Sequence, residues 1–93
     1  MKPIVWSAAK NELLKAQRGI SFEDVVFHML AGDIVETIDH PNQGRYPGQQ
    51  VHVITMEGYI YLVPFVESEE EVFLKTIIPS RKATKKFGGA GNE

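Results

Sequence analysis

Positive charge is concentrated in one short stretch near the end of the chain. The stretch TIIPSRKATKKF, residues 76–87, places four cations directly after an apolar run that stops at Pro79. Ser80 is a suitable N-cap, so the sequence predicts a short basic helix over residues 81–87 that carries Arg81, Lys82, Lys85 and Lys86. Cations in a first helical turn oppose the helix dipole, but they help the free N–H groups there to hold an anion such as phosphate. The alternative interpretation is a solvated helix that keeps the chain soluble.

The first of two predicted hairpins brings a histidine into a β-sheet. The β-rich runs VHVITM and YIYLVPFV are separated by Glu57 and Gly58, which suit a two-residue hairpin loop. This register places His52 opposite Val63. Pro64 has no N–H group to donate, so it requires a bulge or an unpaired edge position.

The second predicted hairpin decides which residues share a face with this histidine. We expect residues 67–71 to form its loop with Val66 opposite Val72, which puts Lys75 in the cross-strand row of His52. One face is then aliphatic and should receive the helices; it carries Val51, Val53, Ile60, Leu62, Leu74, Thr76 and Ile78. The other face mixes aromatic and basic groups: His52, Ile54, Tyr59, Tyr61, Phe65, Phe73 and Lys75. Such a face suits single-stranded nucleic acid, because bases stack on rings and cations meet phosphates, or alternatively a partner interface.

Two helices are predicted before these strands. Ser7 can cap a helix over residues 7–17, which Arg18 and Gly19 end. A second helix over residues 21–31 has Ser21 as its N-cap. Its third residue is Asp24, Gly32 follows its end, and its apolar stripe consists of Phe22, Val25, Val26, Met29 and Leu30.

The order of these elements predicts one α+β domain over residues 1–87. Two N-terminal helices pack on a four-stranded antiparallel meander sheet, and the short basic helix follows. The expected strands cover residues 33–39, 51–56, 59–66 and 72–78. The tail 88–93, GGAGNE, has nothing to bury and is expected to be disordered.

Composition narrows the class of protein further. A net charge of −2 argues against a general nucleic-acid binder, although the charge is segregated between the basic C-terminal stretch and an acidic run at 67–71. The chain has no cysteine, which excludes disulfide and thiolate chemistry and is compatible with the cytoplasm. Neither a signal peptide nor a stretch that could span a bilayer is present, so we expect a cytoplasmic protein with no membrane partner.

The reactive residue types limit the chemistry. The three histidines, at positions 28, 40 and 52, lack metal-ligand spacing, and no phosphate-binding or dinucleotide glycine motif occurs, so no metal or cofactor is expected. We expect His28 to be structural and His40 to be solvated. Catalysis would then run on Lys, Arg, Tyr and His52. Metal-free RNA cleavage fits this set, because the 2′-hydroxyl of the RNA is the nucleophile and the protein positions the strand, stabilises charge and moves protons.

Two stretches carry a family resemblance. Trp6, Lys10 and Gly19, followed by ISFEDV at 20–25, and then IIPSRKA at 77–83 are similar in order and spacing to the motifs of the BrnT family of small toxins. This family belongs to bacterial type II toxin–antitoxin systems and has a RelE/ParE-like architecture. The resemblance spans roughly residues 5–84.

The resemblance implies a cytoplasmic endoribonuclease that cleaves RNA, including ribosome-associated mRNA, without a metal and forms a hetero-oligomer with a co-encoded antitoxin. Arg81 matches the arginine of the second motif. On this hypothesis Lys75 and Arg81 stabilise the phosphate, Arg45 assists, and His52 or Tyr61 transfers protons. The RNA-binding candidates are Lys82, Lys85, Lys86, Tyr59, Lys10 and Arg18.

The chain also departs from the family pattern. Arg18 stands where the family has histidine, Ser7 replaces an acid, Leu14 an asparagine and Thr76 a basic residue. Two other functions therefore stay open. One is a non-catalytic, degenerate toxin or RNA-binding module that acts through its antitoxin, and the other is a pure protein-interaction domain.

Overall fold

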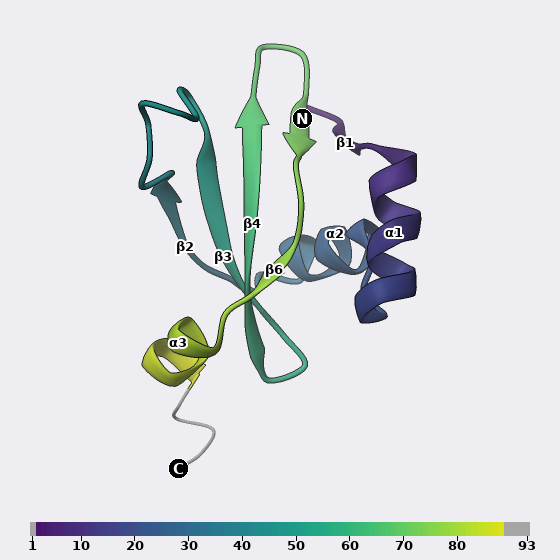
Figure 1. Cartoon of the computed structure of the whole chain (residues 1–93), viewed down its shortest axis with the longest axis vertical. Coiled ribbons are helices and arrows are strands. Elements are labelled where there is room, and N and C mark those ends of the chain that lie inside the picture. Colours follow the sequence, from purple (N-terminus) through teal and green to yellow (C-terminus); the bar gives the residue numbers. More distant parts are fainter. Residues whose placement is uncertain (1, 89–93) are drawn as a thin grey trace.

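The computed structural model describes residues 2–88. Two helices lie on one side of a six-stranded sheet, and a short helical segment lies at the lower end of the sheet (Figure 1). The elements are, in order, β1 (Ile4–Trp6), α1 (Ala8–Arg18), α2 (Phe22–Leu30), β2 (Ile34–Asp39), β3 (Gln50–Met56), β4 (Tyr59–Glu67), β5 (Val72–Leu74), β6 (Ile78–Pro79), α3 (Arg81–Ala83) and η1 (Thr84–Gly88). The predicted α+β class is confirmed. Gly88 ends η1, and the rest of the predicted tail, residues 89–93, lies outside the described residues.

Local capping signals set the bounds of the two long helices as predicted. Ser7 accepts a hydrogen bond from the Lys10 N–H at 3.2 Å, and Gly19 ends α1 with φ 66°. In α2, Ser21 and Asp24 form a reciprocal capping box with hydrogen bonds of 3.1 and 3.0 Å. The predicted apolar stripe of α2 is only partly buried, because Leu30 is 71% exposed.

A buried asparagine joins the two helices. Asn11, 4% exposed, accepts a hydrogen bond from the Phe22 N–H at 2.8 Å and donates one to the Glu23 carboxylate at 2.8 Å. Buried side-chain amides are tolerated in a protein interior when their donors and acceptors are hydrogen-bonded, as they are here. The bonds fix the angle at which α2 leaves α1.

The sheet is mixed rather than purely antiparallel. The strands β2, β3, β4 and β5 pair antiparallel in chain order. β1 pairs with β5 in parallel. β6 pairs antiparallel with β4, on the same edge as β5 but nearer the start of β4. The predicted register of the first hairpin is confirmed, with His52 opposite Val63. β1 was not predicted, since three residues carry too little periodicity to identify a strand.

The predicted register of the second hairpin is wrong by one residue. Val72 lies opposite Glu67 rather than Val66. The loop has four residues, not five, because the Ser68 N–H donates to the Glu71 carbonyl at 2.9 Å and closes it earlier. A slip of one residue exchanges the two faces of a strand.

The predicted strand over 72–78 is also interrupted. β5 ends at Leu74, and the Lys75 N–H still donates to the Pro64 carbonyl at 2.8 Å. In an antiparallel ladder the backbone N and O atoms of one residue face the same neighbouring strand. Pro64 therefore accepts from Lys75 but has no N–H group to donate in return, and β5 ends at this position. The chain resumes pairing as β6, with Ile78 opposite Leu62.

The helices cover the face that was predicted to be open. The main core cluster joins Leu14, Ile20, Phe22 and Val25 of the helical layer to Ile54, Met56, Val63, Phe65, Leu74 and Ile77. The face that carries Val53 and Leu62 instead meets α3. The assignment of faces was therefore wrong for β3 and β4, whereas Leu74, which lies beside Phe65 through the slipped register, does face the helices as predicted.

Candidate active site

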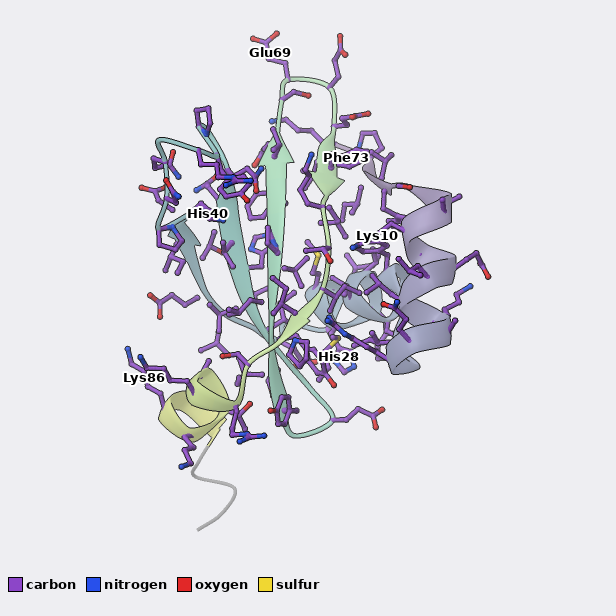
Figure 2. The ribbon with its side chains drawn as sticks, viewed as in Figure 1. Lys10, His28, His40, Glu69, Phe73 and Lys86 are labelled. Atoms are coloured by element: carbon purple, nitrogen blue, oxygen red, sulfur yellow. The ribbon has the colours of Figure 1, made fainter. Side chains whose placement is uncertain are left out.

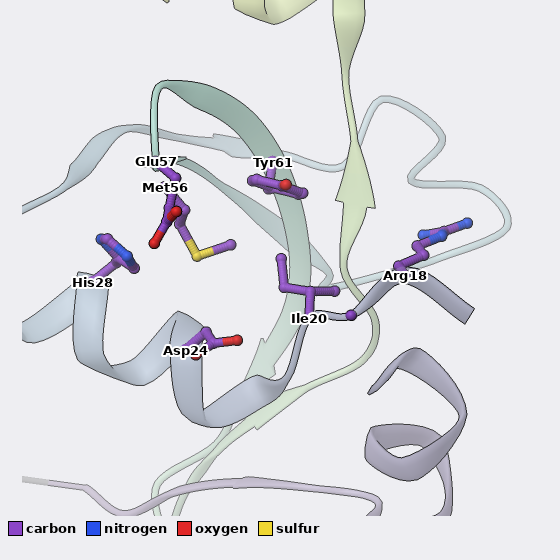
Figure 3. Close-up of a pocket in the computed structure, with 8 residues that line it drawn as sticks. Arg18, Ile20, Asp24, His28, Met56, Glu57 and Tyr61 are labelled. Carbon is purple, nitrogen blue, oxygen red and sulfur yellow. The ribbon is translucent and has the colours of Figure 1, made fainter. Parts of the chain in front are cut away.

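A polar pocket of about 380 Å³ lies where the end of α1, helix α2 and the β3–β4 hairpin meet. Figure 3 shows His28 and Arg18 at opposite ends of this pocket, with Tyr61 and Ile20 between them. The remaining lining residues are Gly19, Asp24, Met56 and Glu57. We call this site the α1–α2 pocket. It gathers a cation, an imidazole and a phenol from separate elements of the chain.

Arg18 lines one end of the pocket because α1 stops immediately after it, and Figure 3 shows its side chain extending away from His28 and Tyr61. Gly19 adopts φ 66°, in the left-handed region that glycine enters at little cost, and turns the chain toward α2. Arg18 Nη1 donates a hydrogen bond to the Ile77 carbonyl at 2.7 Å. Within the described residues no carboxylate lies within ion-pair distance of Arg18, although Asp24 and Glu57 line the same pocket. Arg18, which the sequence predicted to bind RNA, thus lines the α1–α2 pocket.

His28 and Asp33 form a pair at the end of α2. His28 Nδ1 lies 2.7 Å from Asp33 Oδ2, and the Asp33 N–H donates to the His28 carbonyl at 3.0 Å. The two side chains are 19% and 36% exposed. A carboxylate that accepts from Nδ1 leaves Nε2 as the ring nitrogen able to take up a proton. This is the arrangement of an oriented general base.

The β3–β4 hairpin contributes Tyr61 and Glu57. Tyr61 is half-buried, and its ring meets the Tyr59 ring edge-on at 5.6 Å between centroids. Glu57 has φ 55° and Gly58 has φ 80°, as the turn type favoured by two-residue hairpins requires. A non-glycine residue in this region costs roughly 1–2 kcal/mol, so Glu57 is locally strained.

The basic C-terminal segment begins beside Tyr61. Pro79 lies opposite Tyr61, and the Ser80 N–H donates to the Ile60 carbonyl at 3.0 Å. Ser80 caps α3 as predicted, by accepting from the Ala83 N–H at 3.1 Å. Arg81 is exposed at the first position of α3. The predicted helix over 81–87 is a three-residue α3 followed directly by the π-helical η1.

The predicted row of His52 and Lys75 does not form. His52 stacks on Phe65 with centroids 4.0 Å apart, and its Nδ1 lies 2.8 Å from Thr37 Oγ1. Burial lowers the pKa of His52, against an opposing effect of the Glu67 carboxylate. Lys75 follows the end of β5, where its Nζ lies 5.3 Å from the Phe73 ring centroid. The one-residue slip separates the two predicted catalytic residues.

The other predicted residues are distributed over the surface, away from the pocket lining. Arg45 lies in the β2–β3 loop, with its guanidinium carbon 5.6 Å from the Tyr46 ring centroid. Lys10 lies in the first turn of α1. Figure 2 shows Lys86 on the opposite side of the lower sheet from His28. Lys82 and Lys85 are exposed on the same helical segment as Lys86.

The pairing of His28 with Asp33 was not predicted from the sequence. The sequence signal for this pair is its spacing: His28 and Asp33 are five residues apart, and Gly32 lies between them at the end of a helix. A helix that stops between two such residues brings their side chains together. Only the tertiary structure adds Arg18 and Tyr61 to this pair.

Among residues 2–88, no group of three histidine, cysteine or acidic residues is placed to hold a metal ion. No helix within that range is both long and apolar enough to cross a membrane. A scan against protein-family models, a search of curated proteins and a search of solved structures each gave no match for this chain.

Proposed function

We propose that this protein is a metal-independent endoribonuclease, the toxin of a type II toxin–antitoxin system. The observation that carries the proposal is the α1–α2 pocket, which combines Arg18, the His28–Asp33 pair and Tyr61. Residues 72–88, whose Ile77 carbonyl accepts the hydrogen bond of Arg18, hold five cations and no acid. On this proposal the protein acts on RNA in the cytoplasm, has a RelE/ParE-like architecture and is neutralised by a co-encoded antitoxin.

The pocket residues divide the reaction between them. His28 Nε2 accepts the proton of the RNA 2′-hydroxyl while that oxygen attacks the neighbouring phosphorus. The bond from phosphorus to the 5′-oxygen of the next nucleotide breaks, and the Tyr61 hydroxyl donates a proton to that oxygen. The products are a 2′,3′-cyclic phosphate and a 5′-hydroxyl end, and the proton held by His28 returns to the Tyr61 oxygen through water, so atoms and charge balance without a co-reactant.

Charge stabilisation falls to the guanidinium of Arg18. Its planar donors suit phosphate oxygens, and it lies at the pocket end away from His28. Arg81, exposed beyond the strand that pairs with Tyr61, holds the RNA as it leaves the pocket. His52 and Lys75, which sequence reasoning placed at the reaction centre, have no role in this proposal.

The test is cleavage of a single-stranded RNA by the purified protein in the presence of a chelator. We expect fragments that end in a cyclic phosphate. Arg18→Ala, His28→Ala and Tyr61→Phe should each slow their formation, whereas Lys15→Ala, on the exposed side of α1, should not. Intact RNA after prolonged incubation with the folded wild-type protein would contradict the proposal.

A non-catalytic RNA-binding toxin relative is the second candidate. It is favoured by the hydrogen bond from Arg18 to Ile77, which uses part of the guanidinium for structure. Such a protein would bind RNA with an affinity that falls steeply with salt, but would leave the RNA uncut.

A further inference from the structure

A second cavity lies on the face of the sheet opposite the α1–α2 pocket. It measures about 230 Å³ and separates β2, β3 and β4 from the C-terminal helical segment. Val53 and Leu62 are directly opposite each other in its floor, whereas their neighbours Ile54 and Tyr61 point to the other face. We call this cavity the C-terminal groove.

The floor of the C-terminal groove is an apolar row across β3, β4 and β6, and Glu36 of β2 stands at its end opposite Val53. Val53 pairs with Leu62, and Leu62 pairs with Ile78 of β6. Ile78 is 41% exposed, and Ile38, which lines the groove on β2, is 38% exposed. Exposed aliphatic side chains that continue a buried row are typical of a surface that a partner covers.

The wall of the groove is fixed to the sheet. The Ile60 N–H donates to Thr84 Oγ1 at 2.9 Å, and the Thr84 hydroxyl donates to the Ser80 carbonyl at 2.7 Å. These bonds hold α3 and the start of η1 at a set distance from β4. A preformed groove loses little conformational freedom when it binds a ligand.

Charge at the groove selects the class of partner. Lys82 and Lys86 line the wall, and Glu36 is the one acid among the described lining residues. The residues 72–88 that build the wall contain no acid. A cationic rim above an apolar floor suits a peptide that presents carboxylates around an apolar side chain. A nucleic-acid backbone would satisfy the rim but would leave the aliphatic floor unfilled.

A second copy of this chain fits less well. Its acidic loop, residues 67–71, offers four carboxylates, and its one other residue is the polar Ser68. The loop has no apolar side chain to enter the floor. This loop is therefore not the expected occupant, and we commit to a segment of a different protein.

We propose that the C-terminal groove binds a short acidic segment of a partner protein, whose apolar side chain enters the cavity between Val53, Leu62 and Ala83 while its carboxylates meet Lys82 and its neighbours. The inference does not rest on the proposed ribonuclease activity. Because the groove and the α1–α2 pocket open on different faces, a bound peptide leaves the pocket accessible.

The experiment is a selection of short random peptides displayed on phage against the full chain, followed by affinity measurement with the synthesised consensus peptide. We expect a consensus with an aliphatic or aromatic residue flanked by Asp or Glu. Ile38→Glu and Lys82→Glu should each weaken its binding by about tenfold or more. Leu30→Asp and Lys15→Glu, matched changes on exposed positions of α2 and α1, should change it less than twofold.

Three outcomes would overturn the proposal. The first is the lack of a consensus, and the second is a consensus peptide that binds the Ile38→Glu protein as well as the wild type. The third is displacement of the peptide by a short single-stranded RNA, which would assign the groove to nucleic acid. Thermal unfolding of each variant confirms that a loss of binding does not reflect a loss of folding.

Discussion

Arg18 and Ile77 are 59 residues apart in the sequence, and a hydrogen bond of 2.7 Å joins the Arg18 guanidinium to the Ile77 carbonyl. The bond ties the end of α1 to the segment between β5 and β6, where Ile77 is fully buried. It therefore fixes one end of the α1–α2 pocket relative to the strand that leads into the basic C-terminal segment. The same cation contributes to the fold and, on our proposal, to phosphate binding.

Arg18→Ala should lower the free energy of unfolding by about 1–3 kcal/mol, because it leaves a buried carbonyl without its donor. The measurement is urea denaturation followed by fluorescence of Trp6. Lys15→Ala, which removes an exposed cation of the same helix, is the control and should stay within about 0.5 kcal/mol of the wild type. An unchanged Arg18→Ala midpoint would mean that water replaces the donor.

His28→Ala should reduce the rate of RNA cleavage by about 10²–10⁴-fold, the usual contribution of a positioned general base. Added imidazole should restore part of the rate, because the small molecule can occupy the vacated space. A residue with a purely structural role would not show this rescue. Loss of cleavage without any rescue, in a protein that remains folded, would count against His28 as the base.

Asp33→Asn tests the orientation of that base. An amide can donate to Nδ1, which would favour the tautomer with its proton on Nε2 and leave no acceptor toward the pocket. We expect slower cleavage in single-turnover measurements with little change in RNA affinity. Equal loss of affinity and rate would instead indicate that the His28–Asp33 pair only shapes the turn from α2 to β2.

Glu57→Asn should raise the free energy of unfolding and should also strengthen RNA binding. Asparagine tolerates the positive φ at this turn better than glutamate does, so the free energy of unfolding should rise by about 0.5–1 kcal/mol. Removing an acid from the pocket lining should also strengthen RNA binding, most clearly at low salt. Glu69→Asn removes the same charge from the distant β4–β5 loop, and we expect it to leave RNA affinity unchanged.

His52 should make stability depend on pH. Burial lowers its pKa in the folded state below the ordinary value of 6.5, so the unfolded chain takes up the proton first as the pH falls. The free energy of unfolding should therefore decrease from pH 6.5 downward until the folded pKa is passed. Denaturation at a series of pH values should show this slope in the wild type and in His40→Gln but not in His52→Phe, which also keeps a ring against Phe65.

Features that depend on neighbouring residues were predictable from the sequence. The capping box of Ser21 and Asp24, the end of α1 at Gly19 and the register across Glu57 and Gly58 all follow from local hydrogen bonds and backbone dihedral preferences. Ser80 likewise caps the helix where it was expected. These contacts form within a few residues, so the sequence specifies them directly.

Features that depend on distant packing were not predictable in the same way. One hydrogen bond of Ser68 shortens a loop by a residue, and this decides which face of β5 carries Leu74 and thereby separates Lys75 from His52. β1 exists as a strand because β5 offers it an edge, not because three residues prefer that conformation.

The sequence by itself determined the α+β class, the caps of the helices, one hairpin register and the concentration of cations near the C-terminus. The tertiary structure decided which sheet face the helices cover, and it brought Arg18, His28 and Tyr61 to one pocket while leaving His52 in another part of the sheet. The physical reason is that side-chain alternation in a strand turns a one-residue difference in pairing into opposite faces, and only the full set of long-range contacts selects between the two registers.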